Sequence, residues 1–324
     1  MMGHTDAPGQ DWGERSRRWA GVVSRVHQVD GMEVHYLRAE PSRRPGEPTT
    51  HLLLHPMGAG SWSWLDVVAP LATGGRVIVP DLPGAGRTRP ADPRDARAEN
   101  SPEFLEGLCR ALDLDRVVVH GHSLGGLAGT LFAARHPTRV SRLVLTSPVL
   151  PGSPDPPRFP RAWRLALGAA PTVARVPVRI ALRVKGRAWR RWQADPTDPA
   201  LAERMFRGSV DVTQISPDLL TLLAEEVERV RLPWRVDGML QAAASAVAAL
   251  TVKEEAVRAE LDRIRAPTLV LWGRHDTVLP RALCEELRQS HPEWTVTEVE
   301  GVGHLLPWEA PTTYVELVRD WMTQ

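Results

Sequence analysis

Lysine is almost absent from this chain of 324 residues, and cysteine is scarce. Lys185 and Lys253 are the only two lysines, so arginine carries nearly all of the positive charge. The two cysteines, Cys109 and Cys284, fall in segments with the periodicity of amphipathic helices. With so few cysteines, two reduced and half-buried thiols are a simpler interpretation than a disulfide bridge. The scarcity of cysteine therefore argues against a fold held together by disulfides.

Long apolar runs are missing too. No stretch reaches the roughly 18 apolar residues that a membrane-spanning helix needs. The N-terminus from Met1 to Trp19 is polar and lacks the continuous apolar core of a signal peptide. The formal net charge is only +1, so the overall charge does not favour nucleic acid or a membrane as a partner. These absences predict a soluble, cytoplasmic protein that does not bind nucleic acid.

The chain does contain a regular alternation of short apolar runs and segments of helical period. Val22–Val29 and Val34–Leu37 flank Asp30-Gly31, a dipeptide suited to a hairpin turn. Later runs have the composition of parallel strands buried on both faces, and they are His51–His55, Arg76–Val79, Arg116–His120, Arg142–Thr146, Thr268–Trp272 and Thr295–Val299. Helical segments lie between them at Trp62–Leu71, Pro102–Leu112, Leu124–Arg135, Arg281–Ser290 and Thr312–Met322. The alternation predicts an α/β fold with a doubly wound, mostly parallel sheet.

The alternation breaks once along the chain. Between Pro151 and about Asp262 there is no strand run, only a helical pattern punctuated by proline, and this stretch is too long for a loop in a compact domain. We therefore expect a mainly helical cap over residues 151–262. It would be inserted into an α/β core made of residues 21–150 and 263–324. Residues 1–20 show weak periodicity and are expected to form a mobile N-terminal arm.

A serine flanked by glycines follows the strand predicted at 116–120. It lies in Gly121-His122-Ser123-Leu124-Gly125, directly before the helix predicted at 124–135. An attacking serine must stand clear of the backbone, and a sharp strand-to-helix turn with glycine neighbours allows this. The first amides of the new helix would also point at a developing oxyanion. An ordinary glycine turn is the alternative, because the five-residue pattern also occurs by chance.

A serine hydroxyl needs a base, and the base needs an orienting carboxylate. His304 follows the last predicted strand, and Asp276 follows the strand at 268–272. Taken singly, a loop histidine is usually a surface residue and a loop aspartate usually forms a turn. Ser123, Asp276 and His304 each stand at the carboxyl end of a strand, which favours a catalytic triad over three unrelated loop residues. His122 and His275, which neighbour two of them, are expected to serve packing or loop structure.

No cofactor or metal site is predicted. His51 and His55 are spaced for one face of a helix, but they fall in a predicted strand without a cluster of further ligands. No phosphate-binding glycine-lysine loop is present, and Gly84-Ala85-Gly86 lacks the context of a dinucleotide fingerprint.

In combination these motifs resemble the α/β-hydrolase superfamily, specifically its cap-bearing branch of serine esterases, lipases and C–C hydrolases. The resemblance covers most of residues 22–322. It is carried by Gly-His-Ser-Leu-Gly-Gly at 121–126, Asp-Leu-Pro-Gly-Ala-Gly-Arg at 81–87, Trp-Gly-Arg-His-Asp at 272–276 and Gly-His-Leu-Leu-Pro-Trp-Glu-Ala-Pro at 303–311. The resemblance implies that Ser123 is the nucleophile, His304 the base and Asp276 the orienting acid.

The resemblance also implies an oxyanion hole made by the backbone N–H groups of Met57 and Leu124. Members of the superfamily usually carry His-Gly after the strand at 51–55, whereas this chain has His55-Pro56. Proline has no N–H, but position 56 is not the expected donor, so the oxyanion hole can survive. Pro56 fixes its own φ and restricts His55, and we therefore expect a stiffer loop.

The predicted activity is hydrolysis of a carboxylic ester or a related acyl compound, apolar or partly apolar, through an acyl-enzyme on Ser123. Relatives that act on epoxides or haloalkanes carry aspartate at the nucleophile position, so Ser123 argues against both. Two alternatives stay open. The same triad and pocket could serve a C–C bond hydrolase, a lyase or a cyclase, and Gly58-Ala59-Gly60 offers a roomy loop for them. A non-catalytic ligand-binding protein could also keep the fold and the pocket.

One segment of the predicted cap concentrates the positive charge. The stretch from Arg158 through Arg191 has a charge of +10 and no acidic residue, so the rest of the chain carries −9. Five of its arginines recur every four residues, a spacing that aligns them on a helix, and they are Arg175, Arg179, Arg183, Arg187 and Arg191. A solvated cap helix is the plain interpretation. The alternative is a docking face for an anionic partner, such as an acyl chain bound to a carrier protein.

Overall fold

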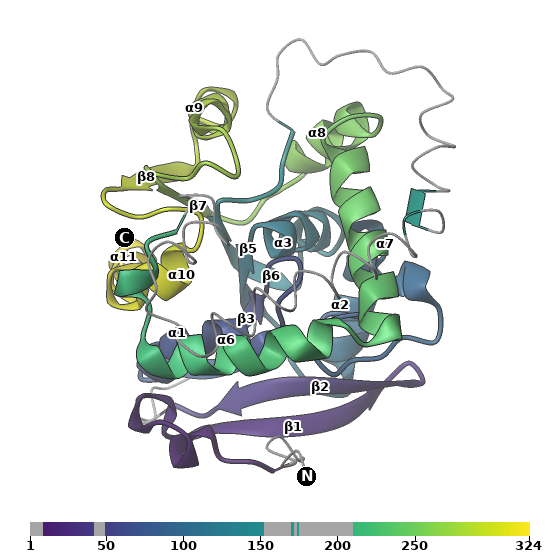
Figure 1. Ribbon diagram of the computed structural model, residues 1–324. Coiled ribbons are helices and arrows are strands. Elements are labelled where there is room, and N and C mark those ends of the chain that lie inside the picture. Colours follow the sequence, from purple (N-terminus) through teal and green to yellow (C-terminus); the bar gives the residue numbers. More distant parts are fainter. Residues whose placement is uncertain (1–8, 42–48, 152–169, 172–173, 175–209) are drawn as a thin grey trace.

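The computed structural model describes residues 9–41, 49–151, 170–171, 174 and 210–324 (Figure 1). Its centre is one sheet of eight strands in the order β1-β2-β4-β3-β5-β6-β7-β8. The strands are β1 (Val22–Val29), β2 (Met32–Ala39), β3 (Thr49–Leu54), β4 (Gly75–Pro80), β5 (Val117–His122), β6 (Val140–Thr146), β7 (Thr268–Gly273) and β8 (Thr295–Val299). All pairings from β4 through β8 are parallel, which confirms the predicted α/β fold with a mostly parallel sheet.

A long hairpin forms one edge of the sheet. β1 and β2 pair antiparallel along their whole length, and β2 also pairs antiparallel with β4. Asp30 and Gly31 both have positive φ, 47° and 83°, as a tight two-residue hairpin turn requires. β2 is longer than the run predicted at 34–37, because pairing with its neighbours rather than apolar content sets its ends.

Helices cover both faces of the sheet. On one face α1 (Leu65–Leu71) and α11 (Pro311–Met322) pack against each other. On the other face α2 (Ser101–Ala111), α3 (Leu124–Arg135) and α9 (Arg281–Ser290) bury side chains in a second apolar cluster. α3 is buried along nearly its whole length, since its glycines and alanines let it approach the sheet closely. This packing against the sheet fixes the position of α3, whose first residue follows Ser123 at the carboxyl edge of the sheet.

Part of the predicted helical cap is described. Residues 210–262 contain α6 (Pro217–Val230), α7 (Pro233–Ala249) and α8 (Glu254–Leu261), and α6 and α7 meet at a sharp corner (Figure 1). α8 packs on α3 of the core, so this part of the insertion does not stand apart from the sheet. The predicted basic stripe from Arg175 to Arg191 lies outside the described residues. Among the helices that are described, none combines the length and the apolarity needed to cross a bilayer.

Residues 9–20, which belong to the arm predicted over residues 1–20, pack against the core. This segment forms two single-turn 3₁₀ helices, and Trp12 and Trp19 are only 2% and 1% exposed. The Trp19 indole N–H donates to Asp66 Oδ1 at 2.7 Å. Two buried indoles remove a large apolar area from water, which orders even a short segment. Because each helix has a single turn, the segment lacks the periodicity that sequence analysis relies on.

The ordered N-terminal segment also contacts the cap. Ser16 Oγ donates to Asp218 Oδ2 at 2.5 Å, and Asp218 lies in the first turn of α6. Asp66, which binds the indole of Trp19, accepts a second hydrogen bond from Ser216 Oγ at 2.6 Å. Ser216 is the N-cap of α6, so the start of this cap helix is tied to the core through buried polar side chains.

Candidate active site

Ser123 stands on a sharp turn between β5 and α3. Its φ of 54° and ψ of −115° are unfavourable for a residue with a side chain, and such strain persists only where the surroundings enforce it. The surroundings are backbone groups of β6 and its following loop. Ser123 N–H donates to the carbonyl of Thr146 at 2.9 Å, and the carbonyl of Ser123 accepts from Val149 N–H at 3.0 Å. The strained turn lifts the hydroxyl away from the backbone at the carboxyl edge of the sheet.

The glycines on either side of Ser123 allow neighbouring backbone to approach closely. A Cβ at Gly121 would lie 2.4 Å from the carbonyl oxygen of Gly125. A Cβ at Gly125 would lie 2.3 Å from the carbonyl oxygen of Leu54, at the end of β3. Backbone atoms on both sides leave no room for a side chain, so the G-x-S-x-G spacing is a steric requirement of this turn.

The structure brings the three predicted triad residues together. His304 Nε2 lies 3.2 Å from Ser123 Oγ, and His304 Nδ1 lies 2.8 Å from Asp276 Oδ2. The other oxygen of Asp276 accepts backbone N–H groups from Val278 at 2.8 Å and Leu279 at 3.0 Å. Burial pushes the pKa of Asp276 upward, but the hydrogen bond and charge of His304, together with the Leu279 N–H, outweigh it and hold this pKa below its usual range. Asp276 is therefore set to stay ionised beside the imidazole.

The loops that carry Asp276 and His304 are joined to each other. They follow β7 and β8, which are neighbours in the sheet. His275 N–H donates to the carbonyl of Val302 at 2.9 Å, just before His304. The backbone of Gly273 touches that of Gly303 so closely that a Cβ at Gly273 would lie 2.0 Å from its carbonyl oxygen. The register between β7 and β8 thus sets the distance between acid and base.

His122 holds the backbone of His304, a role that the sequence did not predict. Its Nε2 lies 2.8 Å from the carbonyl oxygen of His304, and the two rings are 5.3 Å apart between centroids. A carbonyl only accepts, so Nε2 carries the proton. Burial, followed by the charge of His304, lowers the pKa of His122 to about 3, which keeps the ring neutral. The signal available in the sequence was its place directly before the nucleophile.

Met57 lies on the loop after β3, and Leu124 opens α3. Within the described residues, neither backbone N–H donates to a backbone acceptor, so both amides are free for a ligand. His55 braces the loop of Met57. Its Nδ1 lies 2.9 Å from the carbonyl oxygen of Pro56, and its Nε2 lies 3.0 Å from the backbone N of Leu82. One neutral tautomer satisfies both partners, and burial lowers the pKa of His55 in agreement with it.

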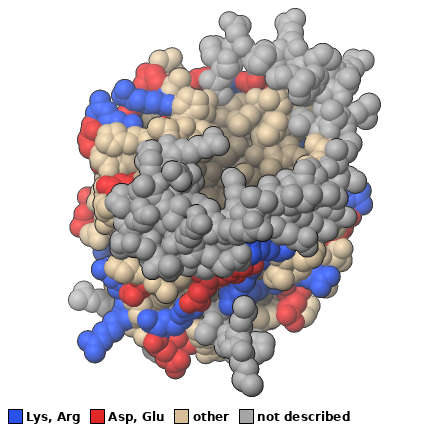
Figure 2. All heavy atoms as spheres, in the orientation of Figure 1, with Lys and Arg blue, Asp and Glu red and all other residues tan. Residues whose placement is uncertain are grey.

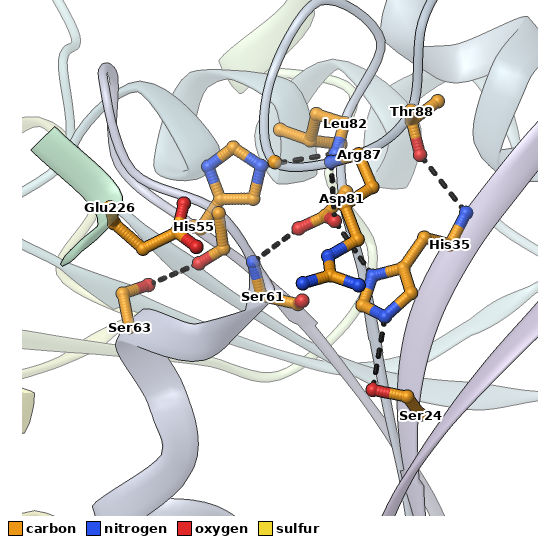
Figure 3. A network of polar contacts seen from close by, with 12 residues as sticks. Ser24, His35, His55, Ser61, Ser63, Asp81, Leu82, Arg87, Thr88 and Glu226 are labelled. Carbon is orange, nitrogen blue, oxygen red and sulfur yellow. Dashed lines mark hydrogen bonds and ion pairs between the residues drawn. The ribbon is translucent and has the colours of Figure 1, made fainter. Parts of the chain in front are cut away.

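A buried polar cluster around Asp81 binds the chain at Ser61, shortly after Met57 (Figure 3). Asp81, just after β4, accepts the backbone N–H of Ser61 at 2.5 Å and of Arg87 at 2.9 Å. Its other partner is His35, whose Nδ1 lies 2.7 Å away. Burial raises the pKa of Asp81, but the charge and hydrogen bond of His35, together with His55 and the Ser61 N–H, outweigh burial and hold this pKa far below its usual range. Gly86 has a φ of 50°, and any Cβ there would collide with the Asp81 carboxylate.

A cavity of about 610 Å³ opens over Ser123 and His304. Figure 2 shows a hollow on this face whose visible floor belongs to uncharged residues. Its described lining is mostly apolar and none of it carries a fixed charge; it consists of Pro56, Met57, Gly58, Ala59, Trp62, Ser123, Val210, Leu223, Thr277, Val278, His304, Leu305 and Trp308. In the part of the chain that the structure describes, no group of three His, Cys, Asp or Glu side chains could hold a metal ion.

Comparison with known proteins decides the family. A family model described as the alpha/beta hydrolase family matches residues 52–317. The chain belongs to the alpha/beta hydrolase family. This confirms the predicted membership and the fold, and it makes the protein a member of a family of hydrolases.

Two curated relatives in the alpha/beta hydrolase family differ in activity. The chain is 26% identical to the 2-hydroxy-6-oxononadienedioate/2-hydroxy-6-oxononatrienedioate hydrolase of Cupriavidus pinatubonensis, over 84% of this chain and 86% of the relative. It is 24% identical to the monoacylglycerol lipase ABHD6 of Homo sapiens, over 94% and 88%. Among solved structures, the enol-lactonase of Burkholderia xenovorans LB400 has a TM-score of 0.65 and 23% identity, covering 92% of this chain and 100% of that one. At this identity the structural likeness shows the fold alone.

Proposed function

We propose that this protein is a serine hydrolase that cleaves an uncharged carboxylic ester through an acyl-enzyme on Ser123. The observation that carries the proposal is the hydrogen-bonded series Ser123–His304–Asp276, buried at the base of an apolar cavity. A serine hydroxyl alone is a weak nucleophile, and a base at hydrogen-bond distance with its own carboxylate partner is what activates it.

The chemistry proceeds in two steps. In the first, Ser123 Oγ attacks the ester carbonyl while His304 Nε2 takes its proton and then returns it to the departing alcohol. In the second, His304 takes a proton from water as the water oxygen attacks the acyl carbon, and His304 then passes this proton to Ser123 Oγ as the C–Oγ bond breaks and the acid leaves. Asp276 keeps Nδ1 protonated and stabilises the imidazolium that forms in both steps.

The oxyanion formed in each step needs donors, and we assign this role to the backbone N–H groups of Met57 and Leu124. Leu124 is the first residue of α3, so its amide adds the positive end of the helix dipole. The amide of Met57 is held by a loop braced through His55, and Pro56 is not required to donate. This assignment explains how the loop functions without the usual glycine.

The lining of the cavity supports an uncharged, largely apolar acyl chain. A substrate with carboxylate groups would need a cation in the pocket, and the described lining of the large cavity contains none. Arg235 lines a smaller neighbouring pocket, but its guanidinium already donates to Glu226 at 3.1 Å and to the carbonyl of Gly86 at 2.6 Å. Arg235 is therefore already paired with a carboxylate, that of Glu226.

A second candidate function is hydrolysis of a C–C bond, in which water is added across that bond. It is favoured by the similarity to a 2-hydroxy-6-oxononadienedioate hydrolase over 84% of this chain. The same serine and histidine would serve the reaction, but its substrate bears two carboxylates. The described lining, which carries no fixed charge, supports the ester more than this substrate, and we therefore propose this function second.

The test is a panel of p-nitrophenyl esters of increasing acyl length, together with 2-hydroxy-6-oxononadienedioate, run on wild type and on Ser123→Ala. We expect turnover of the esters, covalent labelling by a fluorophosphonate, and a fall of about 10⁴-fold or more in kcat for Ser123→Ala. Ser141→Ala is the matched control, since Ser141 Oγ donates to the carbonyl of Val117 away from the site.

Each other outcome points to a different function. Turnover of the dioate without the esters would favour the C–C hydrolase. Absence of both turnover and labelling would leave a ligand-binding protein. Near-wild-type turnover by Ser123→Ala would overturn the role of Ser123 altogether.

A further inference from the structure

A single buried carboxylate holds the loop that presents His304. Glu309, the last residue of α10 (Leu306–Glu309), turns its side chain back towards this loop. Its Oε2 accepts the backbone N–H of Gly303 at 3.0 Å, and its Oε1 accepts that of Leu305 at 3.0 Å. These two amides flank His304 in the chain. The carboxylate therefore grips the backbone on both sides of the imidazole.

The same carboxylate reaches a second element. Oε2 also accepts the backbone N–H of Asp211 at 3.1 Å. Asp211 precedes α6 in the chain, and its neighbour Val210 lines the large cavity together with Leu223 of α6. Glu309 Oε2 is thus a hydrogen-bond acceptor shared by the His304 loop and by the cap entrance, the segment at Asp211 that leads into α6.

Stability alone does not account for a carboxylate at this place. Glu309 is 5% exposed, and among the described residues no arginine, lysine or histidine forms an ion pair with it. Burial raises the pKa of Glu309, although hydrogen bonds from three backbone amides oppose the rise. On balance these surroundings work against the ionised form of Glu309. Burying an unpaired charge costs folding free energy, and an uncharged side chain of similar shape would avoid this cost.

We propose that Glu309 is a positioning residue that sets the direction of the His304 imidazole and couples the His304 loop to the cap entrance at Asp211. This inference rests on the proposed role of His304 as the base. Two amides fix the backbone on either side of His304, while His122 fixes its carbonyl. These three contacts fix the backbone from which the imidazole projects, and the contact of Nδ1 with Asp276 then leaves Nε2 facing Ser123.

Glu309→Gln is the first test. Glutamine keeps the size of the side chain but replaces one acceptor oxygen by an amide that donates, so at least one of the three backbone donors loses its partner. A misplacement of about 1 Å in a catalytic group can cost about 100-fold in rate. We expect kcat on a neutral ester to fall about 10- to 100-fold, with KM changed less than roughly threefold, because the carboxylate does not line the substrate cavity.

Two further readouts separate positioning from a merely structural role. The downfield proton NMR signal of the hydrogen bond between His304 Nδ1 and Asp276 should shift or broaden in Glu309→Gln. The melting temperature should change little, since the variant also removes a buried charge. Glu309→Asp keeps the charge but withdraws the oxygens from the amides, so it should lower kcat as well. Glu316→Gln, on the exposed face of α11, is the matched control and should change none of these quantities.

The outcomes distinguish this inference from the proposed function. If Ser123→Ala is inactive but both Glu309 variants keep wild-type kcat and an unchanged NMR signal, the positioning role is overturned and the proposed function stands. If kcat and the melting temperature fall together while the NMR signal is unchanged, Glu309 is structural and the inference is again overturned. If Ser123→Ala keeps full turnover, the proposed function fails first, whatever Glu309 does.

Discussion

The nucleophile half and the base half of the candidate site are built by different means. On the nucleophile side, Ser123 is placed by backbone contacts: a strained turn, two glycines without room for a Cβ, and hydrogen bonds to the strand beside it. On the base side, His304 is placed by side chains, since Asp276, His122 and Glu309 each bind a different part of it or its loop. Steric exclusion aims the nucleophile, and buried hydrogen bonds aim the base.

This difference predicts how the two halves tolerate change. A side chain that only fills space can be exchanged with modest effect. A side chain that supplies a buried hydrogen bond leaves its partner unsatisfied when it is replaced, and the penalty is larger. The nucleophile half should therefore be sensitive to its backbone, and the base half to its side chains.

Among the variants that test this comparison, Asp276→Asn should lower kcat the most. The variant keeps the size of the side chain but loses the charge that stabilises the imidazolium, and its amide can select the wrong tautomer of His304. We expect kcat to fall about 10³- to 10⁴-fold with the fold intact, measured by steady-state kinetics on a neutral ester and by circular dichroism. Asp262→Asn, at an exposed position, is the control. A mild fall in kcat would mean that another residue is the orienting acid, and the base half would then not depend on Asp276.

Met57 tests the nucleophile half, with an intermediate effect. Met57→Ala should alter the preference for acyl length, because the side chain lines the cavity, while kcat stays within roughly tenfold. Met57→Pro deletes the backbone N–H and should lower kcat about 10²- to 10³-fold, the usual loss for an oxyanion donor. Comparing kcat of the two variants on one ester separates side chain from backbone. Equal kcat values would mean that this amide is not a donor.

Asp81→Asn should have the smallest effect on turnover and act mainly on stability. Asp81 is a buried polar group on the nucleophile side, and its pKa is lowered in the folded state. A lowered pKa contributes stability at pH above the ordinary carboxyl value, about 4, and this contribution is lost as the pH falls towards the folded value. We expect the free energy of unfolding to drop by about 3–5 kcal/mol at pH 7, as for other buried pairs that lose one partner.

The pH dependence is the sharper measurement for Asp81. Urea unfolding gives the free energy of unfolding of wild type and of Asp81→Asn. The difference between these two free energies should be largest at neutral pH and become smaller below roughly pH 4. Asp115→Asn is the control, because the Asp115 side chain is 99% exposed and its replacement should matter little at any pH. A difference between wild type and Asp81→Asn that is independent of pH would show that ionisation of Asp81 does not stabilise the fold.

Several features could be predicted from the sequence because each depends on neighbours in the chain. Asp30-Gly31 predicted the hairpin, since a tight turn needs positive φ at both positions, and the apolar runs predicted the strands. The G-x-S-x-G spacing is also local, because the glycines relieve clashes within one turn and with the adjacent strand. The order Ser123, Asp276, His304 at strand ends was sufficient to predict that the three would meet, since parallel strands end at one edge.

The features that sequence analysis missed depend on contacts between distant segments. Trp12 and Trp19 are buried in a core that they help to build. The single-turn helices that contain them have no periodicity from which this burial could be predicted. His122 binds the carbonyl of His304 and Glu309 binds the amides on either side of it, and the identity of a residue does not reveal which carbonyl or amide it will meet. Whether a buried histidine or glutamate is a packing residue or a positioning residue depends on that partner.

The sequence by itself determined the α/β fold and which three side chains stand at the strand ends. Periodicity, turn chemistry and strand order can be recognised because each depends on short stretches of chain. Only the tertiary structure decided how His304 is aimed, how the loop of Met57 is braced, and how the N-terminal segment joins α6. These depend on which backbone groups the buried polar side chains meet, whether a few residues away, as for Glu309, or far along the chain, as for His122. Burial makes each such partner matter, since no water is there to replace it.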